Sequence, residues 1–516
     1  MKLASVRTRL VFSISANGLR AAISFLTGLL IARGLGPGGY GDLSFLIGSF
    51  VAIRSLLDMG SAGAFYTFIS QRQRRPEYYL YYWGWLAAQF LFSLILVIVI
   101  LPQDTVQRLW LGHSKGMIVA ALAASFMQQQ VWMTIVQIGE AARQTVKIQL
   151  LGLALAAFHF LQILALLFLD VLSVTSTLLA TVFVYLLAVA VSVRLLRTGA
   201  KRARAATDFS AREMFREYLV FCRPLMLMSF ASFVYEFADR WLLQRYGGPE
   251  QQGFYQAAMQ FSSVSLLVAM SVLNIFWKEI SEAYDRQDRD RVARLYWKTN
   301  RSLVLLSTIV ASMLLPWAEQ IVRVVFGDAY APAWASFAIL MLYPIHQSMG
   351  QINSTMFFAC RQTRSYTAIG IAVMAASIPV TWFVIAPTSS PVIAGLELGA
   401  LGLALKMVGM NVASVNVQAW LLARLNGWKY DWQFQVFGVL LIMSLAYVSK
   451  VGACLLLGEP SSTNQWREIL PVFLLSTAVY FALVVSLIAA RPAIAGLTRA
   501  EIDGGLRKFQ GAFRSP

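Results

Sequence analysis

Residues 29–46 read LLIARGLGPGGYGDLSFL, an apolar helix end followed by a turn and the start of a second apolar segment. Residues 244–255 read QRYGGPEQQGFY and match the first stretch at four positions. Each position recurs 212 residues further on: Arg33, Gly36, Pro37 and Gly41 become Arg245, Gly248, Pro249 and Gly253. Pro and Gly end a helix and turn the chain. The pattern predicts an internal repeat in which each half begins with two helices joined by the same turn.

Apolar runs of about 20 residues, each long enough to cross a hydrocarbon core of about 30 Å, surround both turns. They lie near residues 10–32, 43–69, 80–101, 116–138, 148–169, 172–196, 219–243, 254–278, 301–322, 333–359, 366–386, 393–423, 433–457 and 470–490. The runs predict an all-α polytopic membrane protein with about 14 transmembrane helices. Of the 516 residues 58% are hydrophobic and 13% charged, which excludes a soluble enzyme.

The predicted helices divide the chain into two six-helix lobes plus two C-terminal helices. The boundaries are an N-terminal lobe at 1–196, a basic linker at 197–218, a C-terminal lobe at 219–425, helices 13 and 14 within 426–490, and a basic tail at 491–516. Because six is even, both lobes start on the same side, as parallel repeats that can rock around a central cavity. The connections 197–218 and 279–300 are expected to form short helices on the membrane surface or solvated charged loops.

The chain is strongly basic, with 43 Lys and Arg against 25 Asp and Glu. With the N-terminus inside, about 31 of these basic residues fall in inside segments and about 6 in outside ones. This bias predicts that linker, tail and both termini are cytoplasmic. It accounts for the net charge of +18 without nucleic acid. Anionic membrane lipids are the expected partners of the basic loops.

Charged residues inside predicted helices are functional candidates, because each costs at least about 2.5 kcal/mol at the bilayer centre. The predicted substrate-binding cavity residues are Arg20, Arg54, Arg240, Asn17 and Lys406. The candidates for a coupling ion or for ion pairs are Asp58, Glu236 and Asp239. Polar residues that share one face of these helices are interpreted as lining a wet central cavity. The alternative is that they form hydrogen bonds between helices in a dry bundle.

Two oppositely charged pairs have the spacing of four residues that allows pairing on one helix face, Arg54 with Asp58 and Glu236 with Arg240. Arg20, Arg223 and Lys406 have no such local partner, so the cavity should be net positive. An arginine fork suits phosphate or carboxylate. The sequence contains no Walker A motif, cofactor motif or metal-ligand spacing, and its short outside loops disfavour a membrane-embedded glycosyltransferase. A transporter without cofactor or metal, rather than an enzyme, is predicted.

An ordered series of motifs carries a family resemblance. After residues 29–46 come LLDMGSAGAF (56–65), ADRWLLQRYGGPEQQGFYQAA (238–258), FGDAYAPAW (326–334) and FFACRQTR (357–364). The series resembles the Wzx-type flippases for O-antigen and exopolysaccharide, members of the multidrug/oligosaccharidyl-lipid/polysaccharide exporter superfamily.

The resemblance implies a MATE-like fold with two lobes around a cavity, a bacterial inner-membrane location, and an undecaprenyl-diphosphate-linked oligosaccharide as cargo. It also implies a role in polysaccharide or lipopolysaccharide biosynthesis, with H⁺ or Na⁺ as candidate coupling ions and the polymerase machinery as a candidate partner. Related lipid II flippases use cavity arginines near the diphosphate, and Arg20 and Arg54 are similar in placement, whereas Arg240 matches less closely. The alternatives are a lipid II flippase and a MATE-like drug or metabolite antiporter.

Overall fold

The structure, a computed structural model, describes residues 6–72, 74–196, 210–391, 393–460, 466–496 and 499. All regular elements in these ranges are helices, as predicted. Eleven of them are long and apolar enough to cross a membrane. The prediction of an all-α multi-pass membrane protein is therefore confirmed, while the count of fourteen spans stays a prediction. Most of the linker and of the tail lies outside the described residues.

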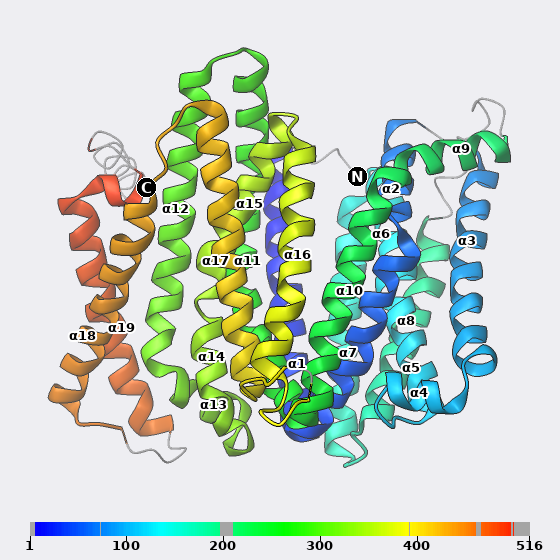
Figure 1. Ribbon diagram of the computed structural model, residues 1–516, viewed down its shortest axis with the longest axis horizontal. Helices are drawn as coiled ribbons and strands as arrows, with labels where there is room; N and C mark the ends of the chain where they lie inside the picture. The colour runs from blue at the N-terminus through cyan, green and yellow to red at the C-terminus, as the bar shows by residue number, and fades with distance from the viewer. Residues whose placement is uncertain are drawn as a thin grey trace. The chain divides into compact units, whose positions relative to one another are not determined.

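The chain forms two compact units, one of residues 1–256 with 374–400 and the other of residues 257–373 with 401–516. The helices of the first unit are α1 (Val6–Asp58), α2 (Ser61–Gln71), α3 (Pro76–Ile95), α4 (Gln103–Leu109), α5 (Lys115–Phe126), α6 (Met133–Ala141), α7 (Thr145–Phe168), α8 (Val174–Leu196), α9 (Ala211–Cys222) and α10 (Met226–Leu242) (Figure 1). Two π-helical turns, η2 (Met127–Trp132) and η5 (Leu243–Gly247), join α5 to α6 and α10 to α11. The predicted lobe boundaries at 196 and 219 stay a prediction.

The second unit contains the remaining described helices, three of which continue from one unit into the other. These three are α11 (Gly248–Asp285), α16 (Thr363–Ile385) and α17 (Gly399–Asn426). The others are α12 (Arg289–Leu314), α13 (Ala318–Phe326), α14 (Trp334–Leu340), α15 (Tyr343–Ala359), α18 (Val439–Leu457) and α19 (Trp466–Ala490). The core of this unit includes Ile280, Tyr296, Met356 and Leu422, which pack α11, α12, α15 and α17 together.

The two turns of the predicted repeat have the same backbone conformation. Gly36 interrupts α1 at φ 67° and ψ 174°, and Gly248 follows η5 at φ 81° and ψ 177°. This region of backbone space is essentially restricted to glycine. In each case a proline follows and opens the next helix segment, because its fixed φ suits a first helical turn. Gly36 thus divides α1 into two arms, which meet at the lower end of α1 in Figure 1.

The two turns also pack against each other within the first unit. A Cβ atom added to Gly41 would lie 1.8 Å from the carbonyl oxygen of Pro249, and one added to Gly253 would lie 2.0 Å from that of Pro37. The contact is reciprocal, since each glycine faces the proline of the other repeat. The second matching glycine of the repeat is therefore required because two backbones approach too closely for any side chain.

Two predicted segments differ in the structure. The run at 43–69 is broken at Met59 and Gly60, where both residues have positive φ, so that α2 starts afresh at Ser61. The connection 279–300 forms neither a separate short helix nor a long loop, because α11 and α12 extend through it and leave only residues 286–288 between them. Asp288 caps α12 by accepting a hydrogen bond from the Arg291 amide at 2.9 Å. Such a cap satisfies a free backbone amide and so stabilises the start of a helix that begins with polar residues.

Candidate functional site

Arg20 lies in a cavity of about 300 Å³ inside the first unit. The cavity is enclosed by the first arm of α1, η2, α7 and α8, and its polar lining residues are Arg20, Ser24, Thr27, Gln128, His159 and Tyr185. Arg20, Ser24 and Thr27 of the first arm of α1 line this cavity together. None of the lining residues is Asp or Glu, and no hydrogen bond or ion pair between described residues involves Arg20. The cavity presents an uncompensated positive charge.

We call this cavity the Arg20 pocket. Its α7 wall leaves room for the guanidinium group of Arg20. Gly152 of α7 has no side chain, and a Cβ atom added to it would lie 3.3 Å from Nη1 of Arg20. The buried Nδ1 of His159 has no hydrogen-bond partner within the described part of the chain. Sequence reasoning missed the wall residues Gln128, His159 and Tyr185. The signals for them were a run of three glutamines at 128–130 and a lone histidine in an apolar helix.

The fold-back at Gly36 brings Arg20 and Arg54 to a similar level. Arg20 precedes Gly36 by 16 residues and Arg54 follows it by 18. At 1.5 Å per residue these separations correspond to about 24 Å and about 27 Å along the two arms. The π-helical turn η2 links them, since Gln128 lines the Arg20 pocket and Gln129 accepts a hydrogen bond from Arg54 at 3.4 Å.

Arg240 occupies a different level and a different electrostatic setting. It precedes Gly248 by eight residues, or about 12 Å of helix. Its Nη1 lies 3.8 Å from Oε2 of Glu236, and both side chains are about one-third exposed. The expected pair is thus present. A Cβ atom at Gly48 would lie 2.3 Å from Nε of Arg240, so that glycine lets the guanidinium cross the second arm of α1.

The two remaining acidic candidates of the first unit make hydrogen bonds of their own. Asp58 accepts hydrogen bonds from the hydroxyl of Ser61 at 2.8 Å and from the amide of Ala62 at 2.9 Å. It therefore caps the start of α2, where a carboxylate is favoured by the helix dipole, and the expected pair with Arg54 is not formed. Asp239 is buried and accepts a hydrogen bond from Thr381 at 2.7 Å.

The remaining candidates do not line the Arg20 pocket. Asn17 is exposed, one turn before Arg20 on α1. Lys406 is buried on α17 and belongs to the second unit. Arg223 is exposed directly after α9. The roles of all the predicted site residues stay predictions.

A further polar cluster joins the repeat turns to a loop. Oδ1 of Asp42, next to Gly41, lies 3.1 Å from Nε2 of His113 and accepts a hydrogen bond of 2.8 Å from Gln244 of η5. Burial lowers the pKa of His113, but its hydrogen bonds with Asp42 and with the Trp110 carbonyl outweigh that effect and raise the pKa above 6.5. A protonated His113 therefore strengthens its own contact with Asp42.

Comparisons with known proteins are consistent with this architecture. The sequence model of a family described as polysaccharide biosynthesis protein matches residues 8–276. No curated protein sequence matches the chain. A structure of the lipid II flippase MurJ in an inward closed conformation superposes with a TM-score of 0.63 at 13% identity, covering 93% of this chain and 99% of that one.

The structures of two multidrug transporters are also similar. The MATE multidrug transporter DinF-BH, in a structure with a bound ligand, has a TM-score of 0.54 at 13% identity, with 81% of this chain and 94% of that chain covered. An inward-facing MATE multidrug transporter has a TM-score of 0.51 at 12% identity, with 83% and 97% covered. At these identities the likeness establishes the fold. The predicted fold is thereby confirmed, and the family match confirms the predicted resemblance to a polysaccharide family.

Proposed function

The chain belongs to the polysaccharide biosynthesis protein family, and on that premise we propose that it is a flippase for an undecaprenyl-diphosphate-linked oligosaccharide. It would act in the bacterial inner membrane with both termini in the cytoplasm, by alternating access. The observation that carries the proposal is the Arg20 pocket, which has an arginine and no acidic residue in its lining. A lone arginine in a membrane protein favours an anionic ligand over the cations that many drug exporters take.

The levels of the arginines support an ordered passage of the diphosphate. Arg20 and Arg54 lie about 24–27 Å from the repeat turns, close to the full thickness of a hydrocarbon core of about 30 Å. At that level they would meet the diphosphate while it is still near the headgroups. Arg240 lies about 12 Å from its turn, near the middle of the core. Asn17 and Lys406 are further proposed contacts for the sugar and the phosphates.

The membrane potential supplies part of the driving force in this scheme. Each negative charge moved outward gains about 2.3 kcal/mol per 100 mV of inside-negative potential. A doubly charged diphosphate would gain about 4.6 kcal/mol if no cation moves with it. The polyprenyl tail would remain in the lipid, so that only the diphosphate and the sugars cross a polar path.

Glu236 is the acidic residue best placed to bind a coupling H⁺ or Na⁺. It is partly exposed and bound only loosely to Arg240, whereas Asp58 caps α2 and Asp239 is bonded to Thr381. Release of Arg240 from Glu236 by the arriving diphosphate would link cargo binding to a change at the carboxylate.

The test is flipping in proteoliposomes that contain a fluorescent undecaprenyl-diphosphate oligosaccharide. The measured quantity is the rate at which the sugar becomes accessible to an externally added glycosidase. We expect Arg20→Gln/Arg54→Gln to slow flipping at least about tenfold, because charge-assisted hydrogen bonds contribute about 1.5–3 kcal/mol each. The matched control is Arg467→Gln, which removes an exposed arginine of α19.

The same vesicles distinguish the alternative cargoes. Lipid II flipped faster than the oligosaccharide lipid would favour a lipid II flippase, and uptake of cationic dyes without lipid flipping would favour a MATE-like antiporter. If the well-folded double variant flipped the oligosaccharide lipid at the native rate, the proposal that Arg20 and Arg54 bind the diphosphate would be wrong.

A further inference from the structure

A second cavity of the first unit, about 690 Å³ in volume, lies between α3 and α9. Its walls are mainly apolar and aromatic: Leu80, Tyr81 and Trp85 of α3, Met214, Phe215, Tyr218 and Leu219 of α9, and Met226 of α10. Leu80 and Phe215 are 71% and 69% exposed. The volume lies within the range of about 300–1,000 Å³ that is typical of ligand sites. We call it the α3–α9 pocket, and the flippase proposal above does not use it.

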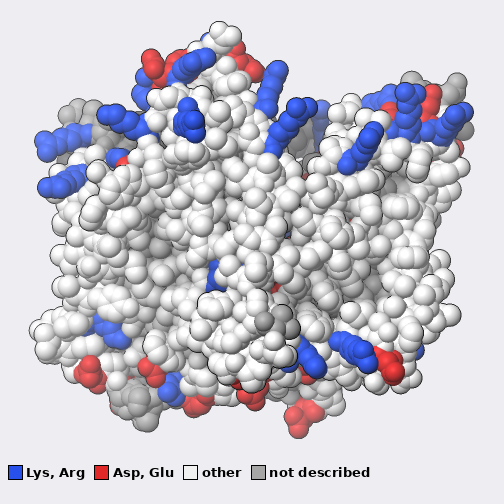
Figure 2. All heavy atoms as spheres, in the orientation of Figure 1, with Lys and Arg blue, Asp and Glu red and all other residues white. Residues whose placement is uncertain are grey.

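The depth of this pocket places it at the boundary between headgroups and acyl chains. Its α3 residues begin four positions after Pro76, where that helix starts, and end at Ala88. These residues therefore lie about 6–18 Å along the helix. Lys and Arg side chains gather over α9 and the neighbouring end of α2 in Figure 2. Basic residues next to a membrane attract anionic lipid headgroups.

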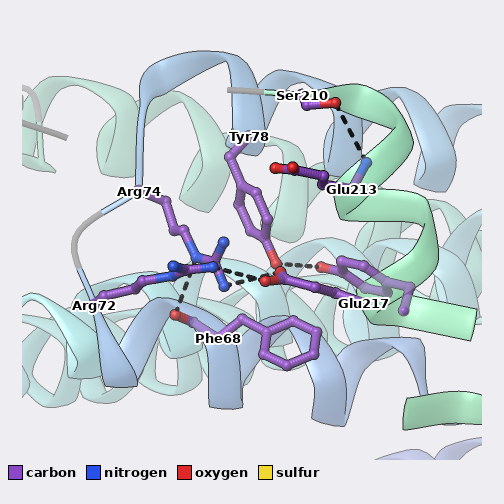
Figure 3. A network of polar contacts seen from close by, with 8 residues as sticks. Phe68, Arg72, Arg74, Tyr78, Ser210, Glu213 and Glu217 are labelled. Carbon is purple, nitrogen blue, oxygen red and sulfur yellow. Dashed lines mark hydrogen bonds and ion pairs between the residues drawn. The ribbon is translucent and has the colours of Figure 1, made fainter. Parts of the chain in front are cut away.

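The two polar sides of α9 have different partners. Glu217 is bound by Arg72 at 2.6 Å and by Arg74 at 3.1 Å, and Figure 3 shows both guanidinium groups pointing at its carboxylate. Glu213 lies in the first turn, where it complements the helix dipole. The acidic side of the helix is thus directed toward the protein and toward the helix start.

The basic side of α9 is left unneutralised. Arg212, Arg216 and Arg223 recur at spacings that place them on one helix face, and all three are exposed. No hydrogen bond or ion pair between side chains of the described residues involves them. Each directly follows a residue that lines the pocket, namely Ala211, Phe215 or Cys222. Positive charge therefore runs along the outer helix that walls an apolar cavity.

The inner wall of the pocket has the opposite character. Asp58 lines it, and its carboxylate already accepts two hydrogen bonds. A phosphate group would be repelled there, whereas an uncharged hydrocarbon chain would not. The charges therefore orient an amphipathic ligand with its tail inward and its anionic head at the three arginines.

We infer that the α3–α9 pocket binds an anionic glycerophospholipid of the membrane, with one acyl chain in the cavity and its phosphate on the basic face that Arg212, Arg216 and Arg223 form along about 16 Å of helix. The site shares no lining residue with the Arg20 pocket. A lipid bound there would hold α9 against α3.

Trp85 provides the readout, because it lines the pocket. The full-length protein in phosphatidylcholine nanodiscs receives increasing phosphatidylglycerol with brominated acyl chains, which quench tryptophan on contact. The signal of this site is the difference between native protein and Trp85→Phe. We expect brominated phosphatidylglycerol to quench it at a mole fraction at least about tenfold lower than brominated phosphatidylcholine.

Two variants test the inference by different routes. Arg212→Gln/Arg216→Gln/Arg223→Gln should abolish the preference for phosphatidylglycerol, whereas Arg289→Gln/Arg294→Gln/Arg467→Gln, an equal loss of exposed charge elsewhere, should retain it. Gly84→Leu should remove the quenching altogether, because Gly84 lines the pocket and no atom lies within 4 Å of its added Cβ. Equal quenching by both lipids, or displacement of phosphatidylglycerol by undecaprenyl phosphate at equal mole fraction, would overturn the inference.

Discussion

The two halves of the internal repeat share a turn but differ in the helices that lead into it. Gly36 and Gly248 adopt the same conformation, and Gly41 and Gly253 make the same close contact. Before the turns the equivalence ends: Ser24, Thr27 and Gly28 of the first half correspond to Glu236, Asp239 and Arg240 of the second. The shared turns therefore determine how the chain folds back, and the differing helices determine the charges that each half presents. The first half presents an unpaired arginine, whereas the second pairs its arginine with an acid.

The largest effect is expected where the two turns touch. Gly41→Val and Gly253→Val should each destabilise the protein by more than about 3 kcal/mol, because backbone on both sides leaves a side chain no room. The measurement is unfolding in mixed micelles together with the folded yield on size-exclusion chromatography. Gly63→Ala is the control, since its Cβ meets open space in a helix. Wild-type stability in either valine variant would contradict the reciprocal contact.

The next effect separates the unpaired arginine from the paired one. Arg20→Gln should slow flipping about tenfold or more without loss of stability, because it removes an uncompensated charge. Arg240→Gln should slow flipping less and lower stability by up to about 1 kcal/mol, because it leaves Glu236 without its partner. Flipping rates and thermal unfolding of the two variants are measured side by side. Equal flipping losses would show that charge balance does not distinguish these arginines.

A smaller effect is expected at the first glycine of each turn. Gly36→Ala and Gly248→Ala should each cost about 1–2 kcal/mol, because their positive φ is strained for an L-residue while the space around them is open. The two costs should agree, since the two backbones match. The comparison uses the same unfolding assay. If the two costs differed by more than about 1 kcal/mol, the two turns would not contribute equally to stability.

The smallest effect concerns Asp42, whose counterpart in the second half is the buried Phe254. Because the folded state raises the pKa of His113, the contribution of this pair is fully present below pH 6.5 and is lost as the pH rises through the raised value. We expect a loss of less than about 1 kcal/mol between pH 6 and pH 9. Unfolding of His113→Gln across that range should lack this component. An identical pH profile for the variant would exclude His113 as its source.

Much of the architecture was predictable because its causes are local in the chain. The length of the apolar runs and the Gly-Pro pairs specify helices and turns without knowledge of any neighbour. The turn at 248–253 repeats residues of the first turn at one constant offset, and the conformation of Gly248 matches that of Gly36. The predicted pair of Glu236 and Arg240 exists because four residues bring two side chains together on any helix.

The environment of each charged residue was harder to predict. Arg54 and Asp58 have the same spacing of four, yet Asp58 instead caps α2, because the chain breaks at Met59 and Gly60. Tyr78 and Tyr82 stand in a run of aromatic residues that is typical of a membrane surface. Both are buried, and the ring of Tyr82 stacks on that of Phe65 with the ring centroids 3.9 Å apart. A run of aromatic residues looks the same in a sequence whether its rings lie at the membrane surface or in the protein core. Only the packing partners of the rings distinguish these two locations.

The sequence by itself determined that this is a multi-pass helical membrane protein with a repeated turn, because hydropathy and backbone restrictions act over a few residues. The tertiary structure decided that Gly41 and Gly253 face each other, that Arg20 lies in an acid-free pocket closed by η2 and α7, and that an apolar cavity separates α3 from α9. Those features arise between segments tens to hundreds of residues apart. Their chemistry depends on which side chains meet, and that is fixed only when the helices pack.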